Sequence, residues 1–197
     1  MIIDNALGAG GTIAAAKVAR AAPDGYTIFL HHMGMSTAPA LYRKLSFDPL
    51  KDFEYIGQVV DVPMTLLGRK DLPANNFKEL QAYVKANGNK VTLANAGLGA
   101  VSHLCGLLFM SQMGVELTTV PYKGTGPAMN DLLGGQVDAS FMNINTAMPQ
   151  IQAGKLRALA ITSAKRSPLL PQVQTLEEGG IKDANVYSWQ AFAAPRG

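Results

Sequence analysis

The stretch "VPYKGTGPAMNDLLGGQVD", residues 120–138, contains the end of one strand, a turn, a helix and the start of a second strand. A β-branched run ends at Tyr122, and the glycines of "KGTG" then allow a tight turn. Pro127 falls at the helix start, where its missing N–H costs nothing, and Gly134-Gly135 ends the helix. This order predicts two parallel strands joined by a helical crossover.

The rest of the chain repeats this alternation. Short apolar runs between turn residues predict strands at 2–4, 27–32, 53–60, 63–69, 90–95, 116–122, 137–143 and 155–162, and a strand-like run starts at 187. Asp61-Val62-Pro63 separates the third of these strands from the fourth. Helical spacing and glycine stops predict helices at 13–21, 37–42, 77–87, 102–113, 128–135, 146–154 and 175–180. The whole pattern predicts an α/β fold.

Ligands of open α/β sheets bind beyond the carboxyl ends of the strands. The loops expected there are residues 5–11, 31–37, 95–102, 122–126 and 142–145. A glycine loop that opens a helix presents unpaired N–H groups at the positive end of the helix dipole, which favours an anion. In "NAGLGAVSHL", residues 95–104, the two glycines allow close approach, and Ser102 adds a hydroxyl or caps the helix. The "GAGG" loop at 8–11 has the same form, and plain turn formation is the alternative for both.

Composition excludes several classes of protein. The 197 residues are 48% hydrophobic and 16% charged, which suits a packed core and argues against disorder. The net charge is +3, and the 17 basic residues are scattered, so a nucleic-acid surface is disfavoured. The single cysteine, Cys105, excludes an internal disulfide and is expected in the core. No apolar run reaches the roughly 18 residues of a membrane span.

No catalytic motif can be assembled. "GAGG" lacks the full glycine spacing of a dinucleotide site, and there is no phosphate-binding loop and no nucleophile elbow. Ser102 and His103 are adjacent on a helix, so their side chains diverge. Three histidines without a matching carboxylate pattern make a weak metal site. We therefore expect no catalytic residue, metal or cofactor. The alternative is an α/β enzyme for a small carboxylate with His32 or His103 as the base.

The run at 120–138 resembles the Bug family, the extracytoplasmic solute receptors (TctC-like) of tripartite tricarboxylate transporters. The resemblance keeps its order and spacing over essentially the whole chain. Further matching stretches are "DNALGAGGTIAA", "AAPDGYTIFL", "PALYRKLSFDPLKDF", "SHLCGLLF", "AGKLRALAITSAKRSPLLPQVQTLEE" and "SWQAFAAPRG".

The resemblance implies a type II-like periplasmic binding protein fold, with two Rossmann-like lobes joined by a two-strand hinge. One lobe would hold residues 1–62 and 188–197, and the other would hold 63–187. The crossing segments would lie near 60–64 and 187–189. Relative to family members, the chain is expected to lack an N-terminal strand–loop–helix unit and a C-terminal helical segment.

The implied function is to bind a small organic carboxylate between the lobes, without catalysis, and to deliver it to the membrane subunits of the transporter. The implied location is the periplasm, and the protein is expected to be a monomer that does not bind nucleic acid. A truncated remnant that binds nothing is the alternative. The ligand-binding residues expected are His32, Met33, Gly34, Ala96, Gly97, Gly99, Ala100, Val101, Ser102, His103, Tyr122, Thr125, Met142 and Asn143.

The sequence departs from the family pattern in three places. Ala6 and Leu7 stand where Arg-Pro usually precedes the first glycine loop, so no charge is expected there. Ala96, Ala100 and Val101 stand where hydroxyl side chains are common, which leaves backbone N–H groups and Ser102 to bind the ligand. Met142 stands where an acidic residue often follows the phenylalanine, so a ligand without an ammonium group is expected. If Met33, Met35, Met142 and Val101 all faced inward, the cleft would favour an aromatic or longer aliphatic carboxylate.

Overall fold

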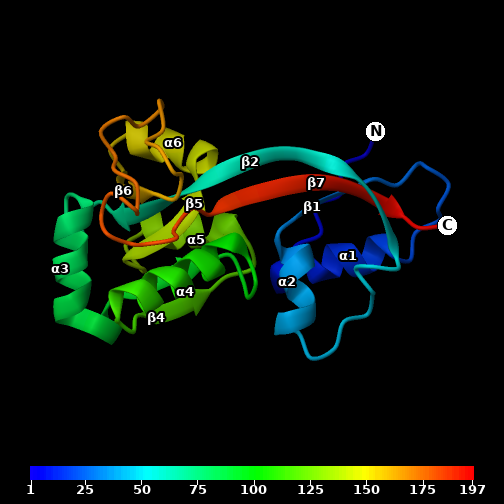
Figure 1. Cartoon of the computed structure of the whole chain (residues 1–197), viewed down its shortest axis with the longest axis horizontal. Coiled ribbons are helices and arrows are strands. Elements are labelled where there is room, and N and C mark those ends of the chain that lie inside the picture. Colours follow the sequence, from blue (N-terminus) through cyan, green and yellow to red (C-terminus); the bar gives the residue numbers. More distant parts are fainter.

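The computed structural model describes residues 1–197 and has two lobes linked by two long strands (Figure 1). Strand β2 (Phe53–Arg69) runs through both lobes. Its residues 53–63 pair with β7 (Tyr187–Pro195), and its residues 64–69 pair with strands of the second lobe. The expected break at Asp61–Pro63 is wrong, because Pro63 lies where β2 has a neighbour on one side only and a proline is tolerated.

The first lobe is built on the sheet β1-β7-β2, with β1 (Phe29–His32) antiparallel to β7. It also contains the turn η1 (Ala9–Gly11) and helices α1 (Thr12–Val18) and α2 (Gly34–Leu41). Its core comprises Ala15, Phe29, Met35, Phe47, Phe53 and Ala193. The strand expected at 2–4 is absent, because no neighbouring strand pairs with these residues, and they are exposed.

The second lobe has a five-stranded sheet in the order β6-β2-β5-β3-β4. The parallel pairing of β3 with both β4 and β5 confirms the predicted crossovers. Its strands besides β2 are β3 (Thr92–Asn95), β4 (Thr118–Pro121), β5 (Ala139–Asn143) and β6 (Leu156–Ile161). Its helical elements are α3 (Phe77–Asn87), η2 (Gly88–Lys90), α4 (Val101–Met113), α5 (Thr125–Leu133) and α6 (Ile144–Gln152).

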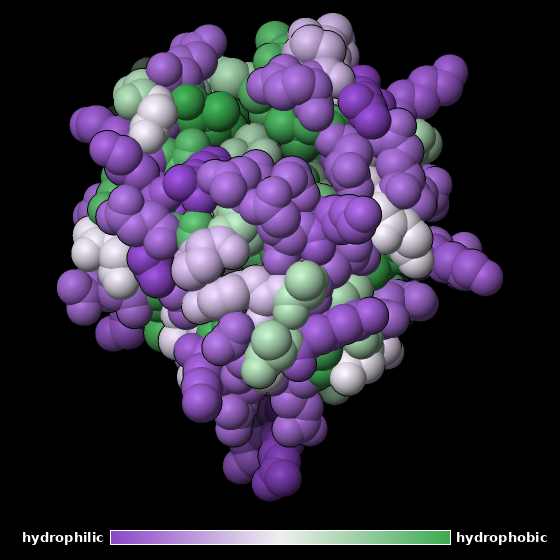
Figure 2. Space-filling model, turned by 90° about the vertical axis from the view of Figure 1, so that its left-hand side faces the viewer, coloured by the Kyte–Doolittle hydropathy of each residue, from purple (hydrophilic) through white to green (hydrophobic).

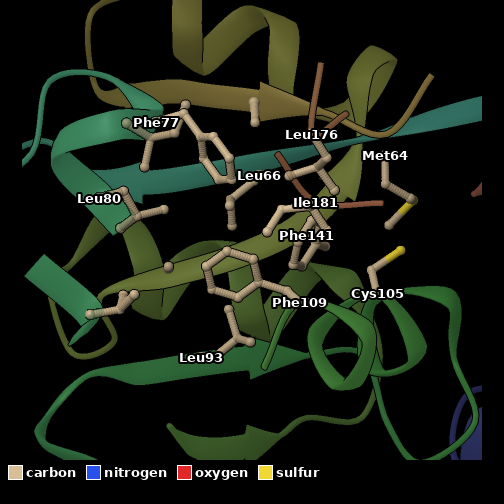
Figure 3. Close-up of a cluster of buried hydrophobic side chains, with 14 of the residues drawn as sticks. Met64, Leu66, Phe77, Leu80, Leu93, Cys105, Phe109, Phe141, Leu176 and Ile181 are labelled. Atoms are coloured by element: carbon tan, nitrogen blue, oxygen red, sulfur yellow. The ribbon is translucent and has the colours of Figure 1, made fainter. Parts of the chain in front are cut away.

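Helices cover both faces of this sheet. The buried side chains of α3 and α4 belong to one large cluster, and those of α5 and part of α6 belong to a second cluster. In the larger cluster Phe109 lies between Phe77 and Phe141, with ring centroids 6.2 and 6.3 Å away (Figure 3). Cys105 is 1% exposed in the same cluster, and burial raises the pKa of its thiol to about 12. The core position predicted for Cys105 is confirmed.

The helix expected at 175–180 is wrong, because these residues form turns. Thr175 and Glu178 bond to each other's backbone N–H groups as in a helix start, but Gly179-Gly180 ends the segment at once. Figure 2 views the outer end of the second lobe, which is mostly hydrophilic. Most of the exposed large apolar side chains belong to the first lobe. None of the helices combines the length and apolar composition that crossing a bilayer requires.

Candidate functional site

A cavity of about 1030 Å³ lies between the lobes, and residues 1–8 form part of its wall. Both lobes form its wall. Three helices of eight or more residues begin there: α2 contributes Gly34, α4 is preceded by Ala100, and α5 contributes Thr125. The predicted loops at 31–37, 95–102 and 122–126 therefore meet at one place.

The first amides of α4 and α5 are available to a ligand. The N–H groups of Val101 and Ser102 have no acceptor within the chain, and neither do those of Thr125 and Gly126. Unpaired N–H groups at the positive end of a helix dipole bind anions. Because both α4 and α5 present such groups from the second lobe, the arrangement suits a carboxylate.

The loop before α4 is held in shape by its own side chains. Ser102 Oγ accepts a 2.9 Å hydrogen bond from the Ala96 N–H, and Asn95 Oδ1 accepts a 3.0 Å bond from the Gly97 N–H. Gly97 has φ +124°, a conformation that L side chains rarely adopt. Ser102 is 5% exposed, so its hydroxyl oxygen shapes the loop and does not face the cavity.

His32 provides a neutral donor in the first lobe. Its Nδ1 accepts a 3.0 Å hydrogen bond from the Gly34 N–H, so the neutral ring carries its proton on Nε2. Burial lowers the pKa of His32, and neighbouring His31 lowers it further. The Nε2–H lies beside Gly11 at the cavity. His103 also has a pKa lowered by burial, and its Nδ1 accepts a 3.4 Å bond from the Gly99 N–H.

The structure brings five of the expected residues to the cavity wall. These are His32, Gly34, Ala96, Ala100 and Thr125. It places the others behind the wall or in the cores: Met33, Gly97, Gly99, Val101, Ser102, His103, Tyr122, Met142 and Asn143. Tyr122, expected as a ligand-binding residue, has its hydroxyl already bonded within the chain. That hydroxyl donates a 2.6 Å bond to Asp131 Oδ2, which raises the tyrosine pKa to about 12.

The expected lining by Met142 and Val101 side chains is also wrong. Met142 is 2% exposed in the core beneath α5, and Val101 is 5% exposed in the core beneath α4. Helices cover both faces of the sheet, so the alternating side chains of β5 are buried in both directions. Met33 packs against the second-lobe core, and only Met35 of the four reaches the wall. These side chains therefore do not favour an aromatic or longer aliphatic ligand, although apolar residues of the first lobe such as Ile2, Leu7 and Phe29 line the wall.

The charged side chains on the wall are Asp4 and Lys17, which pair with each other. The remaining wall offers neutral groups. No three histidine, cysteine or acidic side chains gather closely enough to hold a metal ion.

Sequence reasoning missed two contacts across the lobes. Tyr42 Oη donates a 2.9 Å hydrogen bond to the Leu98 carbonyl. Thr37 Oγ1 lies 3.3 Å from the Gly99 carbonyl oxygen, and 3.4 and 3.5 Å from the Gly34 and Met33 carbonyl oxygens of its own lobe, so its one proton is shared among three acceptors. Each contact across the lobes joins residues more than fifty positions apart, so no local pattern in the sequence indicated it.

His31 lies in an aromatic cluster next to the cavity. It is 4% exposed, and its ring contacts Tyr55 and Trp189 edge-on at 5.4 and 5.6 Å between centroids. Neither ring nitrogen has a hydrogen-bond partner. Burial lowers the pKa of His31, so the folded chain holds it neutral.

We predict that His31→Phe raises the free energy of unfolding by about 1–2 kcal/mol at pH 7.5, because it removes two unpartnered buried nitrogens. Below about pH 6.5 the unfolded chain protonates this imidazole before the folded chain does. The parent therefore loses stability as pH falls from 6.5, by at most about 1.4 kcal/mol per pH unit for one histidine, and the variant loses less. Urea unfolding at pH 7.5, 6.5 and 5.5 measures both effects. If the free energy of unfolding fell equally steeply with pH in the two proteins, His31 would not be the buried neutral histidine described here.

Two lobes joined by long strands, with a cavity between them, are the architecture of the periplasmic binding protein fold. Residues 1–197 match the family described as "Tripartite tricarboxylate transporter family receptor" (TctC). The chain belongs to this family.

Three solved structures illustrate the similarity. The periplasmic binding protein BugD is 53% identical, with a TM-score of 0.96, and the match covers 100% of this chain and 66% of BugD. R. palustris Rpa4515 with adipate is 36% identical, with a TM-score of 0.96 and the same coverage. MatC from Rhodopseudomonas palustris with bound malate is 40% identical, with a TM-score of 0.89, over 96% of this chain and 65% of MatC. The chain spans 57–61% of the length of three curated relatives.

Proposed function

We propose that this chain forms the binding part of a periplasmic receptor. It takes a small organic carboxylate between its lobes, leaves it chemically unchanged, and delivers it to the membrane subunits of a tripartite tricarboxylate transporter. The observation that carries the proposal is the convergence of α2, α4 and α5 N-termini, from both lobes, on one cavity. Family membership supports the location and the transporter partner.

The neutral wall favours a ligand without an ammonium group. Asp4 is paired with Lys17, so an ammonium group in the cavity would lose water without gaining a carboxylate partner. A carboxylate would instead accept bonds from helix-start amides and from His32 Nε2–H. The adipate and malate in two similar proteins support a dicarboxylate.

The proposed contacts divide between side chains and backbone. His32, Gly34, Ala96, Ala100 and Thr125 contact the ligand from the wall. Val101 and Ser102 bind it through their amides, while Gly97, Gly99 and His103 shape the loop that presents these amides.

The proposed hinge lies where the two long strands cross between the lobes. β2 changes partners between Pro63 and Met64, and β7 begins at Tyr187. We therefore divide the lobes at 1–62 with 188–197 and at 63–187. Small backbone rotations at these crossings would let the lobes close on the ligand.

Catalysis has less support. His103 lies behind the wall, and His32 already uses Nδ1 to bond Gly34. No nucleophile or unpaired carboxylate on the wall completes a catalytic set with either histidine. The similar proteins are binding proteins.

Isothermal titration calorimetry with two matched ligand pairs tests the proposal. We expect adipate to bind and adipamide, which has the same length but no charge, to fail. We expect malate to bind at least tenfold tighter than aspartate, which carries an ammonium group in place of the hydroxyl. Aspartate binding more tightly than every simple carboxylate would contradict the ligand class, and a lack of heat with all carboxylates would contradict the function.

A further inference from the structure

The Gly97–Gly99 part of the α4 loop rests directly on the first lobe. Besides the two hydroxyl bonds from Tyr42 and Thr37, the backbone of Gly10 packs so closely that an added Cβ would overlap the Leu98 carbonyl oxygen. A Cβ at Gly99 would lie 2.9 Å from Leu41 Cδ1. The two lobes are therefore in atomic contact at this loop.

Helix α2 connects this contact to the cavity. Its first residue, Gly34, lines the cavity, Thr37 lies one turn further on, and Tyr42 directly follows its last residue. One short helix thus presents its N-terminus to the ligand space and two hydroxyl groups to the opposite lobe.

On the second lobe, the Gly97–Gly99 segment of this contact precedes α4. The Ala100 N–H bonds the Gly97 carbonyl at 3.1 Å, so the loop enters the helix through a tight turn. The next two amides, at Val101 and Ser102, are the unpaired ones. A shift of the loop against α2 therefore moves the amides proposed to hold the carboxylate.

We propose that Tyr42 and Thr37 are positioning residues, which hold the Gly97–Gly99 loop against α2 and so favour the closed, ligand-ready arrangement of the lobes. Both bonds join a neutral hydroxyl to a carbonyl, so each is modest and breaks readily. The inference rests on the proposed function, because the loop is useful only if its amides bind a ligand.

The test measures the distance between the lobes by single-molecule energy transfer, with dyes on Lys51→Cys and Lys85→Cys, both exposed positions. Cys105 is buried and does not react. Without ligand, we expect Tyr42→Phe and Thr37→Val each to lower the ratio of closed to open molecules about fivefold. Thr37→Ser keeps the hydroxyl and should restore the parent ratio. Tyr83→Phe, on α3 away from the contact, is the matched control.

Adipate is then used to test whether the lobe contact affects ligand binding. We expect its dissociation rate to rise about fivefold in Tyr42→Phe and Thr37→Val. Unchanged distance distributions in these two variants would contradict the positioning role of Tyr42 and Thr37. If the distance distributions shift but adipate does not bind the parent protein, the positioning role of Tyr42 and Thr37 is supported and the proposed function is contradicted. If Tyr83→Phe has the same effect as Tyr42→Phe, the effect is not specific to the lobe contact, and the positioning role of Tyr42 is contradicted.

Discussion

Replacing Phe109 with alanine is expected to lower the free energy of unfolding by about 3–5 kcal/mol. Phe109 is 1% exposed and packs between two other phenylalanines in the core of the second lobe (Figure 3). Truncation loses the transfer free energy of the ring and leaves a cavity that helices on a fixed sheet cannot close. Urea unfolding followed by circular dichroism measures the change.

Leu107→Ala is the matched control, because it lies on the same helix but is 44% exposed. Its expected cost is below about 1 kcal/mol. Equal losses for the two variants would mean that the ring of Phe109 does not hold the core together as described.

The second large effect is on ligand binding. Gly10→Ala is expected to weaken adipate binding at least tenfold, because its Cβ would overlap the Leu98 carbonyl when the lobes are together. Gly10 also has φ +61°, a conformation that L side chains rarely adopt. Separating the lobes to relieve the overlap would move the first-lobe donors away from the amides of α4. Calorimetry with adipate measures the change.

Gly57→Ala is its control, since a Cβ there meets nothing within 4 Å. This variant should bind adipate as the parent does. If Gly10→Ala also bound adipate with parental affinity, contact between η1 and the α4 loop would not be part of the binding arrangement.

The elements with strong local signals were predicted well. Helix α3 occupies the predicted residues 77–87, because Asn76 caps it by accepting a bond from the Glu79 N–H and Gly88 ends it. The parallel crossovers between β3 and β5 follow from the alternation of strand and helix alone. These features depend on neighbours in the sequence, so the sequence contains the information.

The failed predictions depended on distant partners. β2 continues through Pro63 because β7, more than a hundred residues away, supports it on one side. Residues 2–4 form no strand because no neighbouring strand pairs with them. In each case the local sequence pattern was compatible both with a paired strand and with its absence.

The candidate site also combines features set by local sequence with features set by distant partners. The start of α4 at Val101 lies within one residue of the predicted start, whereas α2 begins at Gly34, three residues before the predicted Thr37. The sequence therefore indicated which loops would gather, but not every helix start. The directions of the Met142 and Tyr122 side chains depend on how helices cover the sheet, which no local pattern states. The contact of Tyr42 with Leu98 depends on how two lobes meet, and nothing in the sequence indicated it.

The central claim is that helix-start amides of the second lobe and the His32 Nε2–H of the first lobe hold a carboxylate in the cavity. An NMR titration of the ¹⁵N-labelled chain with adipate tests it most directly. We expect the amide signals of Val101, Ser102 and Thr125 and the ring nitrogen signal of His32 to shift the most and to saturate at one common concentration. Saturable shifts confined to one lobe, or shifts that leave these amides and His32 unchanged, would contradict it.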